Sequence, residues 1–90
     1  MSKPIIVDVR EPYEFASGHV KGALNIPPAD LMTGAAALRS VPKDAEIVLY
    51  CRTGSRSNVA MHILQSLGYT NLTNGINQGH VETNWPDVNA

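Results

Sequence analysis

The chain has 90 residues, enough for one modest hydrophobic core but not for two, so we expect a single domain over residues 1–90. Hydrophobic residues make up 43% of the chain and charged residues 17%, a globular balance that excludes an intrinsically disordered protein. A net charge of -1 without a basic cluster excludes the electrostatic footprint of a nucleic-acid-binding protein, and no apolar run approaches the roughly 20 residues that span a membrane.

The first half of the chain alternates short apolar runs with segments of helical character. Residues 5–9 are apolar enough for a buried parallel strand. Pro12 suits the first turn of a short helix, which should end before Gly18. Residues 23–26 predict a second short strand, and residues 29–39 predict a helix in spite of one glycine within them.

The strongest pattern lies in the middle of the chain. Residues 46–50 are the clearest strand. Residues 55–67 are the clearest helix, because apolar side chains recur there at helical spacing and Gly68 follows them. Cys51 and a short polar loop connect the strand to the helix.

The C-terminal part of the chain gives weaker signals. Residues 71–73 predict a last short strand, the Asn74-Gly75 pair predicts a turn, residues 76–83 predict a short helix, and residues 84–90 should be irregular. Strands therefore alternate with helices along the whole chain. This order predicts an α/β fold with a small parallel sheet of about four strands and helices on both faces.

The single cysteine of the chain is Cys51. One cysteine excludes a disulfide within the chain and argues against a cysteine-based zinc site, and we expect no metal or organic cofactor. A lone cysteine is most often a small buried hydrophobe. Cys51, however, stands at the carboxyl end of a predicted strand, which is where parallel sheets bind ligands. We therefore interpret it as a reactive nucleophile.

The loop that follows the cysteine should stabilise a thiolate. The N-terminus of the following helix supplies unpaired N–H groups, and Gly54 lets the backbone curl into an anion-binding nest. Arg52 and Arg56 are unfavourable at a helix N-terminus unless a negative partner is close, and a thiolate or a bound anion would be that partner. Thiolate is the nucleophilic form of cysteine. We assign Ser55 and Ser57 to helix capping rather than to catalysis.

Three segments in this order, residues 6–15, 18–27 and 47–57, resemble the rhodanese family, and specifically its minimal single-domain bacterial members. With residues 68–72 the resemblance covers nearly the whole chain. It implies the rhodanese fold and a sulfurtransferase activity. Sulfane sulfur would pass from thiosulfate to Cys51, giving a persulfide, and then to cyanide or another thiophilic acceptor.

The resemblance also implies roles for the loop residues. Cys51 would be the catalytic residue that carries the persulfide. Arg52 would face the anionic donor and Arg56 would close the loop. The residues that would bind donor and persulfide, mainly through their amides, are Arg52, Thr53, Gly54, Ser55 and Arg56.

Three further residues match family positions away from the reacting sulfur. Asp8 and Arg10 match a pair that we interpret as structural, since a buried Asp8 in an apolar strand would need a partner. His19 is also interpreted as structural.

The chain departs from the family pattern near its C-terminus. Asn74-Gly75-Ile76-Asn77 contains one glycine where the family often has two, and Gly79-His80 stands where an aromatic residue is common. These departures concern the last helix and one wall of the pocket, not the loop.

Three other functions also use a reactive cysteine. Cysteine-dependent phosphatases and arsenate reductases place five residues between cysteine and arginine, whereas four residues separate Cys51 from Arg56 here, a smaller cradle for an anion. A thiol-disulfide oxidoreductase would need a second cysteine. A persulfide carrier that serves a protein partner uses the same site as a turnover enzyme, so this alternative stays open.

The expected partners follow from the implied reaction. They are a small-molecule sulfur donor and a thiophilic acceptor, with a protein acceptor as the alternative, and neither nucleic acid nor membrane. We expect a monomer. Residues 1–4 lead directly into the first apolar run without a signal peptide, which predicts a cytoplasmic protein, or a periplasmic one if a leader has been removed.

Overall fold

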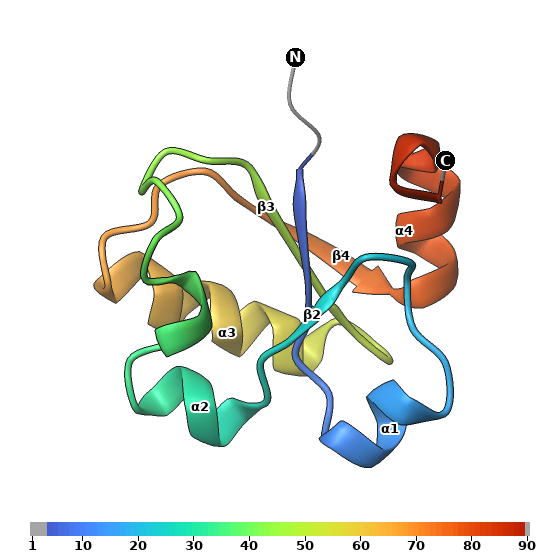
Figure 1. Ribbon diagram of the computed structural model, residues 1–90, viewed down its shortest axis with the longest axis horizontal. Helices are drawn as coiled ribbons and strands as arrows, with labels where there is room; N and C mark the ends of the chain where they lie inside the picture. Colours follow the sequence, from blue (N-terminus) through green and yellow to red (C-terminus); the bar gives the residue numbers. More distant parts are fainter. Residues whose placement is uncertain (1–3, 90) are drawn as a thin grey trace.

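A computed structural model describes residues 4–89 of the chain and shows a four-stranded parallel sheet within them. Its strands are β1 (Ile5–Asp8), β2 (Leu24–Asn25), β3 (Ile47–Cys51) and β4 (Leu72–Asn77), in the order β2-β1-β3-β4 (Figure 1). The chain moves outward from β1 to β2, returns past β1 to β3, and moves outward again to β4. The strand order therefore reverses between β1 and β3, which is where open parallel sheets bind ligands.

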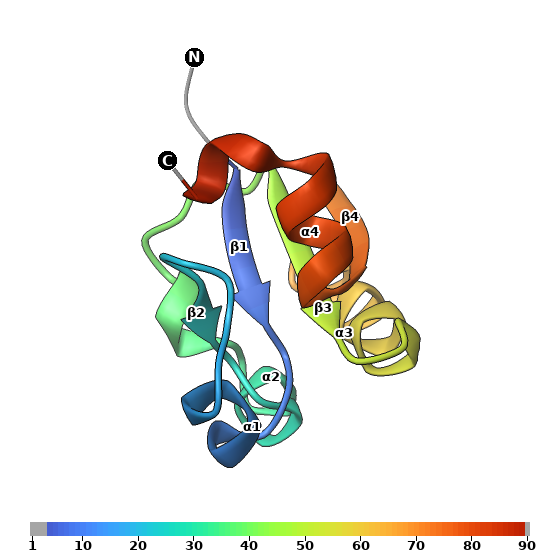
Figure 2. The same cartoon turned by 90° about the vertical axis from the view of Figure 1, so that its right-hand side faces the viewer.

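Helices cover both faces of the sheet, as the sequence predicts. Helices α2 (Pro28–Met32) and α3 (Ser55–Ser66) lie side by side on one face, and α4 (Gln78–Asn84) packs on the other (Figures 1 and 2). The short α1 (Pro12–Ala16) begins at the predicted proline and contributes Phe15 to the face of α4. None of the helices in the described range is long and apolar enough to cross a bilayer.

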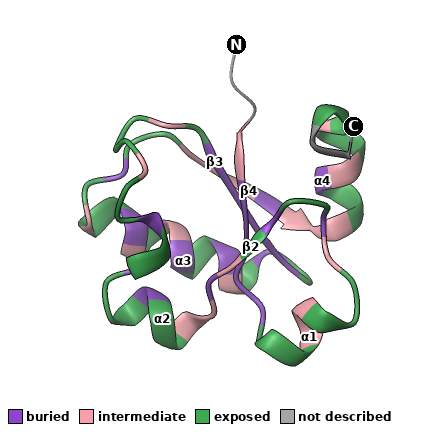
Figure 3. Ribbon diagram, viewed as in Figure 1, coloured by how far each residue is buried: buried purple, intermediate pink, exposed green. Residues whose placement is uncertain are grey.

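Strand β3 is the centre of the core. Its residues from Ile47 to Tyr50 are fully buried, because neighbouring strands cover both edges and helices cover both faces (Figure 3). Alternate side chains of a strand point to opposite faces. Tyr50 accordingly packs in the cluster beneath α4, whereas Cys51 packs in the cluster beneath α2 and α3.

Two predicted segments outside the sheet differ from the structure. The predicted helix over residues 29–39 is broken, because α2 ends at Met32 and both Gly34 (φ 109°) and Ala35 (φ 51°) adopt left-handed backbone conformations before a 3-10 turn at Ala36–Leu38. The tail predicted to be irregular forms a second 3-10 turn over Pro86–Asn89. Residues 1–3, on which the prediction about a signal peptide rests, and Ala90 lie outside the described residues.

The predicted turn at Asn74-Gly75 is wrong, because β4 runs straight through both residues. Leu49 of β3 pairs with Asn74 but Tyr50 pairs with Ile76, so Gly75 is an extra residue in a β-bulge. A Cβ atom on Gly75 would lie 2.5 Å from Cγ2 of Val81 in α4. Glycine is needed here for this close approach and not for a turn.

Candidate active site

Cys51 lies at the carboxyl end of β3, beside the point where the strand order reverses. The cysteine is 2% exposed to solvent, and its thiol forms no disulfide. A hollow of about 220 Å³ opens next to it. The residues that line this hollow lie at or just beyond the ends of three neighbouring strands: Arg10, Cys51, Arg52, Asn77, Gln78 and Gly79.

The loop after Cys51 directs backbone N–H groups at the sulfur atom. Gly54 has a left-handed backbone (φ 94°), and its N–H donates to Sγ of Cys51 over 3.1 Å. Burial raises the pKa of Cys51, but the Ser57 hydroxyl and the N–H groups of Ser57, Thr53 and Gly54 lower it more, to about 7. A substantial fraction of the sulfur is therefore thiolate near neutral pH.

The two serines of the loop do not cap the helix, contrary to prediction. Gly54 occupies the capping position of α3, and no side chain there accepts from the helix. The hydroxyl of Ser55 lies 3.2 Å from the hydroxyl of Thr53. Ser57 is fully buried, with its hydroxyl 3.5 Å from Sγ of Cys51. The structure therefore places the Ser57 hydroxyl against the sulfur of Cys51 rather than in a capping position.

Arg56 forms an ion pair with a residue of α1. Its Nη1 and Nη2 donate to Oε1 and Oε2 of Glu14 over 2.7 and 3.1 Å. The hydrogen bond from Arg56, followed by a backbone hydrogen bond from Glu11, lowers the pKa of Glu14 to about 2. The Arg56 guanidinium is thus engaged outside the hollow, whereas Arg52 is exposed and lines it.

Asp8 has the buried partners that its place in an apolar strand requires. Arg10 donates to both carboxylate oxygens of Asp8, the shortest distance being 2.7 Å from Nη2, and Nη2 also donates to the carbonyl of Gly18 over 2.7 Å. The Tyr50 hydroxyl donates to Asp8 Oδ2 over 2.8 Å and accepts from the N–H of Val20. Burial raises the pKa of Tyr50 above its usual range. These groups form a fixed frame behind the site.

His19 packs on α1 rather than beside Cys51. Its ring stacks on Phe15 with 3.6 Å between the ring centroids, and its Nδ1 lies 2.8 Å from the Phe15 carbonyl oxygen. The ring therefore fixes the end of α1, in line with a structural role.

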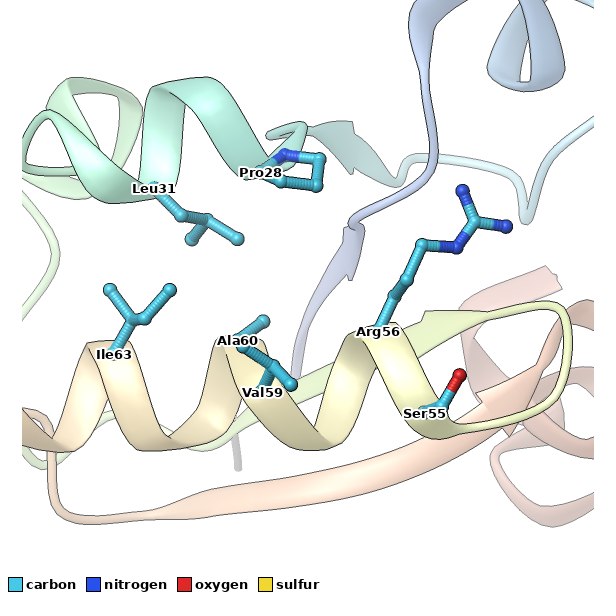
Figure 4. A pocket seen from close by; sticks show the side chains of 7 residues that line it. All are labelled: Pro28, Leu31, Ser55, Arg56, Val59, Ala60 and Ile63. Atoms are coloured by element: carbon cyan, nitrogen blue, oxygen red, sulfur yellow. The ribbon is translucent and has the colours of Figure 1, made fainter.

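A second, apolar cavity of about 280 Å³ lies between α2 and α3. Leu31 and Ile63 point toward one another across it, and Arg56 stands at one end (Figure 4). This cavity offers mainly hydrocarbon to a ligand and does not include Cys51. Across the described residues, no three histidine, cysteine or acidic side chains gather into a group that could hold a metal ion. The polar hollow beside Cys51 is the candidate active site.

Sequence reasoning missed three partners of this site. Glu14 and Tyr50 went unassigned because each acts across 42 residues of sequence, on Arg56 and Asp8 respectively. Asn74 was assigned to a turn, yet its side chain contacts both the loop and Ser57. The missing second glycine at this position was the available signal.

The family model of the rhodanese-like domain matches residues 1–81. The chain belongs to this family. The resemblance and the fold predicted from the sequence are thereby confirmed.

The proteins that are similar to this rhodanese-like domain include sulfurtransferases. A sulfurtransferase of Allochromatium vinosum is 36% identical over 70 residues, covering 78% of this chain and 63% of that protein. The thiosulfate sulfurtransferase PspE of Escherichia coli is 38% identical over 69 residues, covering 76% of this chain and 64% of PspE. The chain thus spans just under two thirds of the length of both relatives.

The solved structures include a similar fold that was determined with anions. This structure, a rhodanese with anions from E. coli, superposes with a TM-score of 0.75 at 31% sequence identity. The superposition covers 86% of this chain and 89% of that chain.

Proposed function

We propose that this rhodanese-like domain transfers sulfane sulfur through a persulfide on Cys51, from thiosulfate to cyanide or another thiophilic acceptor. The observation that carries the proposal is the position of the sulfur atom. It accepts a hydrogen bond from the Gly54 N–H over 3.1 Å, its pKa is held near 7, and it faces a hollow lined by Arg10 and Arg52. The sulfurtransferase relatives support the same reaction class.

The first half-reaction loads the enzyme. The Cys51 thiolate attacks the outer sulfur of thiosulfate, forming a new S–S bond. The bond between that sulfur and the sulfonate group breaks, and its electron pair leaves with sulfite. Sγ is then neutral and the outer sulfur of the persulfide carries a negative charge, which the N–H groups of the loop can stabilise.

The second half-reaction regenerates the thiolate. A thiophilic acceptor such as cyanide attacks the outer sulfur of the persulfide. The S–S bond breaks, its electron pair returns to Sγ of Cys51, and thiocyanate leaves. Both steps conserve charge and need no external oxidant or reductant. The low pKa of Cys51 favours its departure in this step, because a less basic thiolate is a better leaving group.

Arg52 is the side chain that we assign to the anionic donor. It is exposed and lines the hollow, whereas the Arg56 guanidinium is held by both carboxylate oxygens of Glu14. Arg56 would therefore keep the loop in shape, and the loop would hold the persulfide through its amides. Arg10, paired with Asp8, lines the wall of the hollow and adds positive potential.

The proposal is tested by mass spectrometry and a product assay on the same protein. After incubation with thiosulfate, the intact mass should rise by one sulfur atom, and addition of cyanide should remove that mass and release thiocyanate. Cys51→Ala should show neither change, and Cys51→Ser serves as the matched control because it keeps a polar group in the loop.

Each result of this test has a distinct meaning. A sulfur adduct that no small thiophile can remove would contradict the turnover reaction and favour a carrier for a protein partner. Hydrolysis of an aryl phosphate without any sulfur adduct would overturn the proposal in favour of a phosphatase.

A further inference from the structure

The side-chain amide of Asn74 has a fixed orientation next to the loop. Its Nδ2 donates to the carbonyl of Gly54 over 3.0 Å, and its Oδ1 accepts from the N–H of Ile76 over 2.9 Å. Rotating the amide by half a turn would place N–H against N–H at Ile76 and oxygen against oxygen at Gly54. The carbonyl oxygen of Asn74 must therefore be the atom that faces Ser57.

Ser57 has one hydroxyl proton and three acceptors within reach. Oδ1 of Asn74 is 2.6 Å away, the Gly54 carbonyl oxygen 3.1 Å and Sγ of Cys51 3.5 Å. The Gly54 carbonyl already accepts from Asn74 Nδ2 and from the N–H of Asn58. Ser57 is fully buried, so water does not offer an alternative. Asn74 Oδ1 and Cys51 Sγ are therefore the two acceptors that compete for this proton.

We propose that Asn74 is a positioning residue that competes with Cys51 for the hydrogen bond of the Ser57 hydroxyl. The charge on the sulfur decides which of the two accepts it. When Sγ is a neutral thiol, Ser57 donates to Asn74 and its oxygen faces the sulfur as an acceptor. When Sγ is a thiolate, the hydroxyl turns and donates to it, because hydrogen bonds to a charged acceptor are the stronger ones. Asn74 therefore opposes the thiolate by holding the proton that would stabilise it.

Backbone strain beside Asn74 supports this assignment. Ile76 has a φ of 71°, in the left-handed region that a β-branched residue rarely adopts. Its N–H is the donor that fixes the Asn74 amide, and the extra residue Gly75 makes the bulge that allows this contact. Strained residues persist where their surroundings impose the conformation, and they concentrate at functional sites.

The consequence for sulfur transfer rests on the proposed function. In the first half-reaction the charge leaves Sγ of Cys51, so the Ser57 proton should return to Asn74 once the persulfide has formed. In the second half-reaction the charge comes back to Sγ, and the proton should follow it. The Ser57 hydroxyl would thus rotate twice in each cycle, and its proton would stay bonded to Oγ throughout.

The other charged groups near the sulfur do not change in an Asn74 variant. Arg10 and Arg52 line the hollow, and Arg56 contributes a positive charge but is paired with Glu14. The α4 residues that line the hollow, Gln78 and Gly79, carry no charge. A change in the titration of Cys51 on replacing Asn74 therefore reports the Ser57 proton or the shape of the loop.

The sign of that change separates the two explanations. The measurement is the rate of alkylation of Cys51 by iodoacetamide against pH in four proteins: wild type, Asn74→Ala, Ser57→Ala and the double variant. Loss of Asn74 should lower the pKa of Cys51 by about half to one unit, and loss of Ser57 should raise it by about one unit. In the Ser57→Ala background, loss of Asn74 should have no effect, since the shared proton is gone.

Two results would overturn the proposal. One is a higher or unchanged pKa in Asn74→Ala, and the other is an equal shift in both backgrounds, which would show that Asn74 acts through the loop. Asn74→Gly provides a second variant should the alanine variant fold poorly, because glycine is the residue that the family often has here. Alkylation needs no sulfur donor, so this test can succeed or fail independently of persulfide formation from thiosulfate.

Discussion

Two buried polar networks lie next to the hollow, and they differ in whether the direction of their hydrogen bonds is fixed. In the network of Asp8, Arg10 and Tyr50, the carboxylate accepts from both neighbours, so the direction of every hydrogen bond is fixed. In the network of Cys51, Ser57 and Asn74, one proton faces two acceptors. The first network should be rigid, whereas the second can follow a charge. Tyr50 and Cys51 are adjacent residues of β3, and Tyr50 belongs to the first network and Cys51 to the second.

Removal of the Asp8 carboxylate should have the largest effect on stability. Asp8→Ala leaves Arg10 buried without its ion-pair partner and Tyr50 without its acceptor. Breaking a buried pair in this way costs about 3–5 kcal/mol of unfolding free energy. Urea denaturation of the wild type, Asp8→Ala and Asp8→Asn measures it, the asparagine keeping an acceptor without the charge. A loss below about 1 kcal/mol for the alanine variant would show that this network is not a frame.

Tyr50→Phe should have the next largest effect. It removes one hydroxyl at nearly constant volume, and it leaves the N–H of Val20 and one oxygen of Asp8 with one partner fewer. An unsatisfied buried group costs about 1–3 kcal/mol. The same denaturation experiment measures this loss, and the pKa of Cys51 should stay at about 7 because Tyr50 faces the other side of the sheet. A shift in the pH dependence of Cys51 alkylation would show that the two networks are coupled.

Ser57→Ala is the matched change in the adjustable network, since it also removes one buried hydroxyl. Its cost in stability should be about 1 kcal/mol or less, because Asn74 Oδ1 still accepts from Ile76 and the Gly54 carbonyl keeps two donors. Denaturation should thus show less loss than in Tyr50→Phe, while the titration of Cys51 moves. A loss larger than that of Tyr50→Phe would reverse the comparison.

Glu14→Gln should have the smallest effect at neutral pH. Arg56 is partly exposed, and such ion pairs contribute about 1 kcal/mol or less. The pKa of Glu14 is lowered from 4.5 to about 2 in the folded protein. The carboxylate therefore stabilises the fold above about pH 4.5, and this contribution is lost as the pH falls toward 2. Denaturation of both proteins across this range should show their difference vanish, and a constant difference would contradict the pairing.

Local sequence patterns predicted the rigid parts of the molecule well. The buried strand ending at Tyr50, the helix that follows and the position of Cys51 between them are all visible in one short stretch of sequence, because period and composition are local properties. The need for a partner at Asp8 was also predictable, since an ion does not remain buried alone.

Other features depended on contacts that no local pattern contains. Ser57 has the residue type of a helix cap, and only the approach of β4 turns it toward the sulfur. Asn74-Gly75 reads as a turn signal, yet here the glycine is required by Val81 and Val48 packing against it. Gly34 has a low helix propensity, which indicated a weak point in the predicted helix. The break itself depends on the left-handed conformation of Ala35, which the residue type does not predict.

The bulge in β4 makes this part of the chain sensitive to length as well as to composition. Gly75 is the extra residue of the bulge, so its deletion alone would leave Asn74 opposite Leu49 and Ile76 opposite Tyr50. Deleting any other residue of β4 would shift the pairing by one position and turn the side chains beyond it to the opposite face. When related sequences are aligned, a one-residue gap within residues 72–77 therefore belongs at Gly75, even where another position raises the apparent identity.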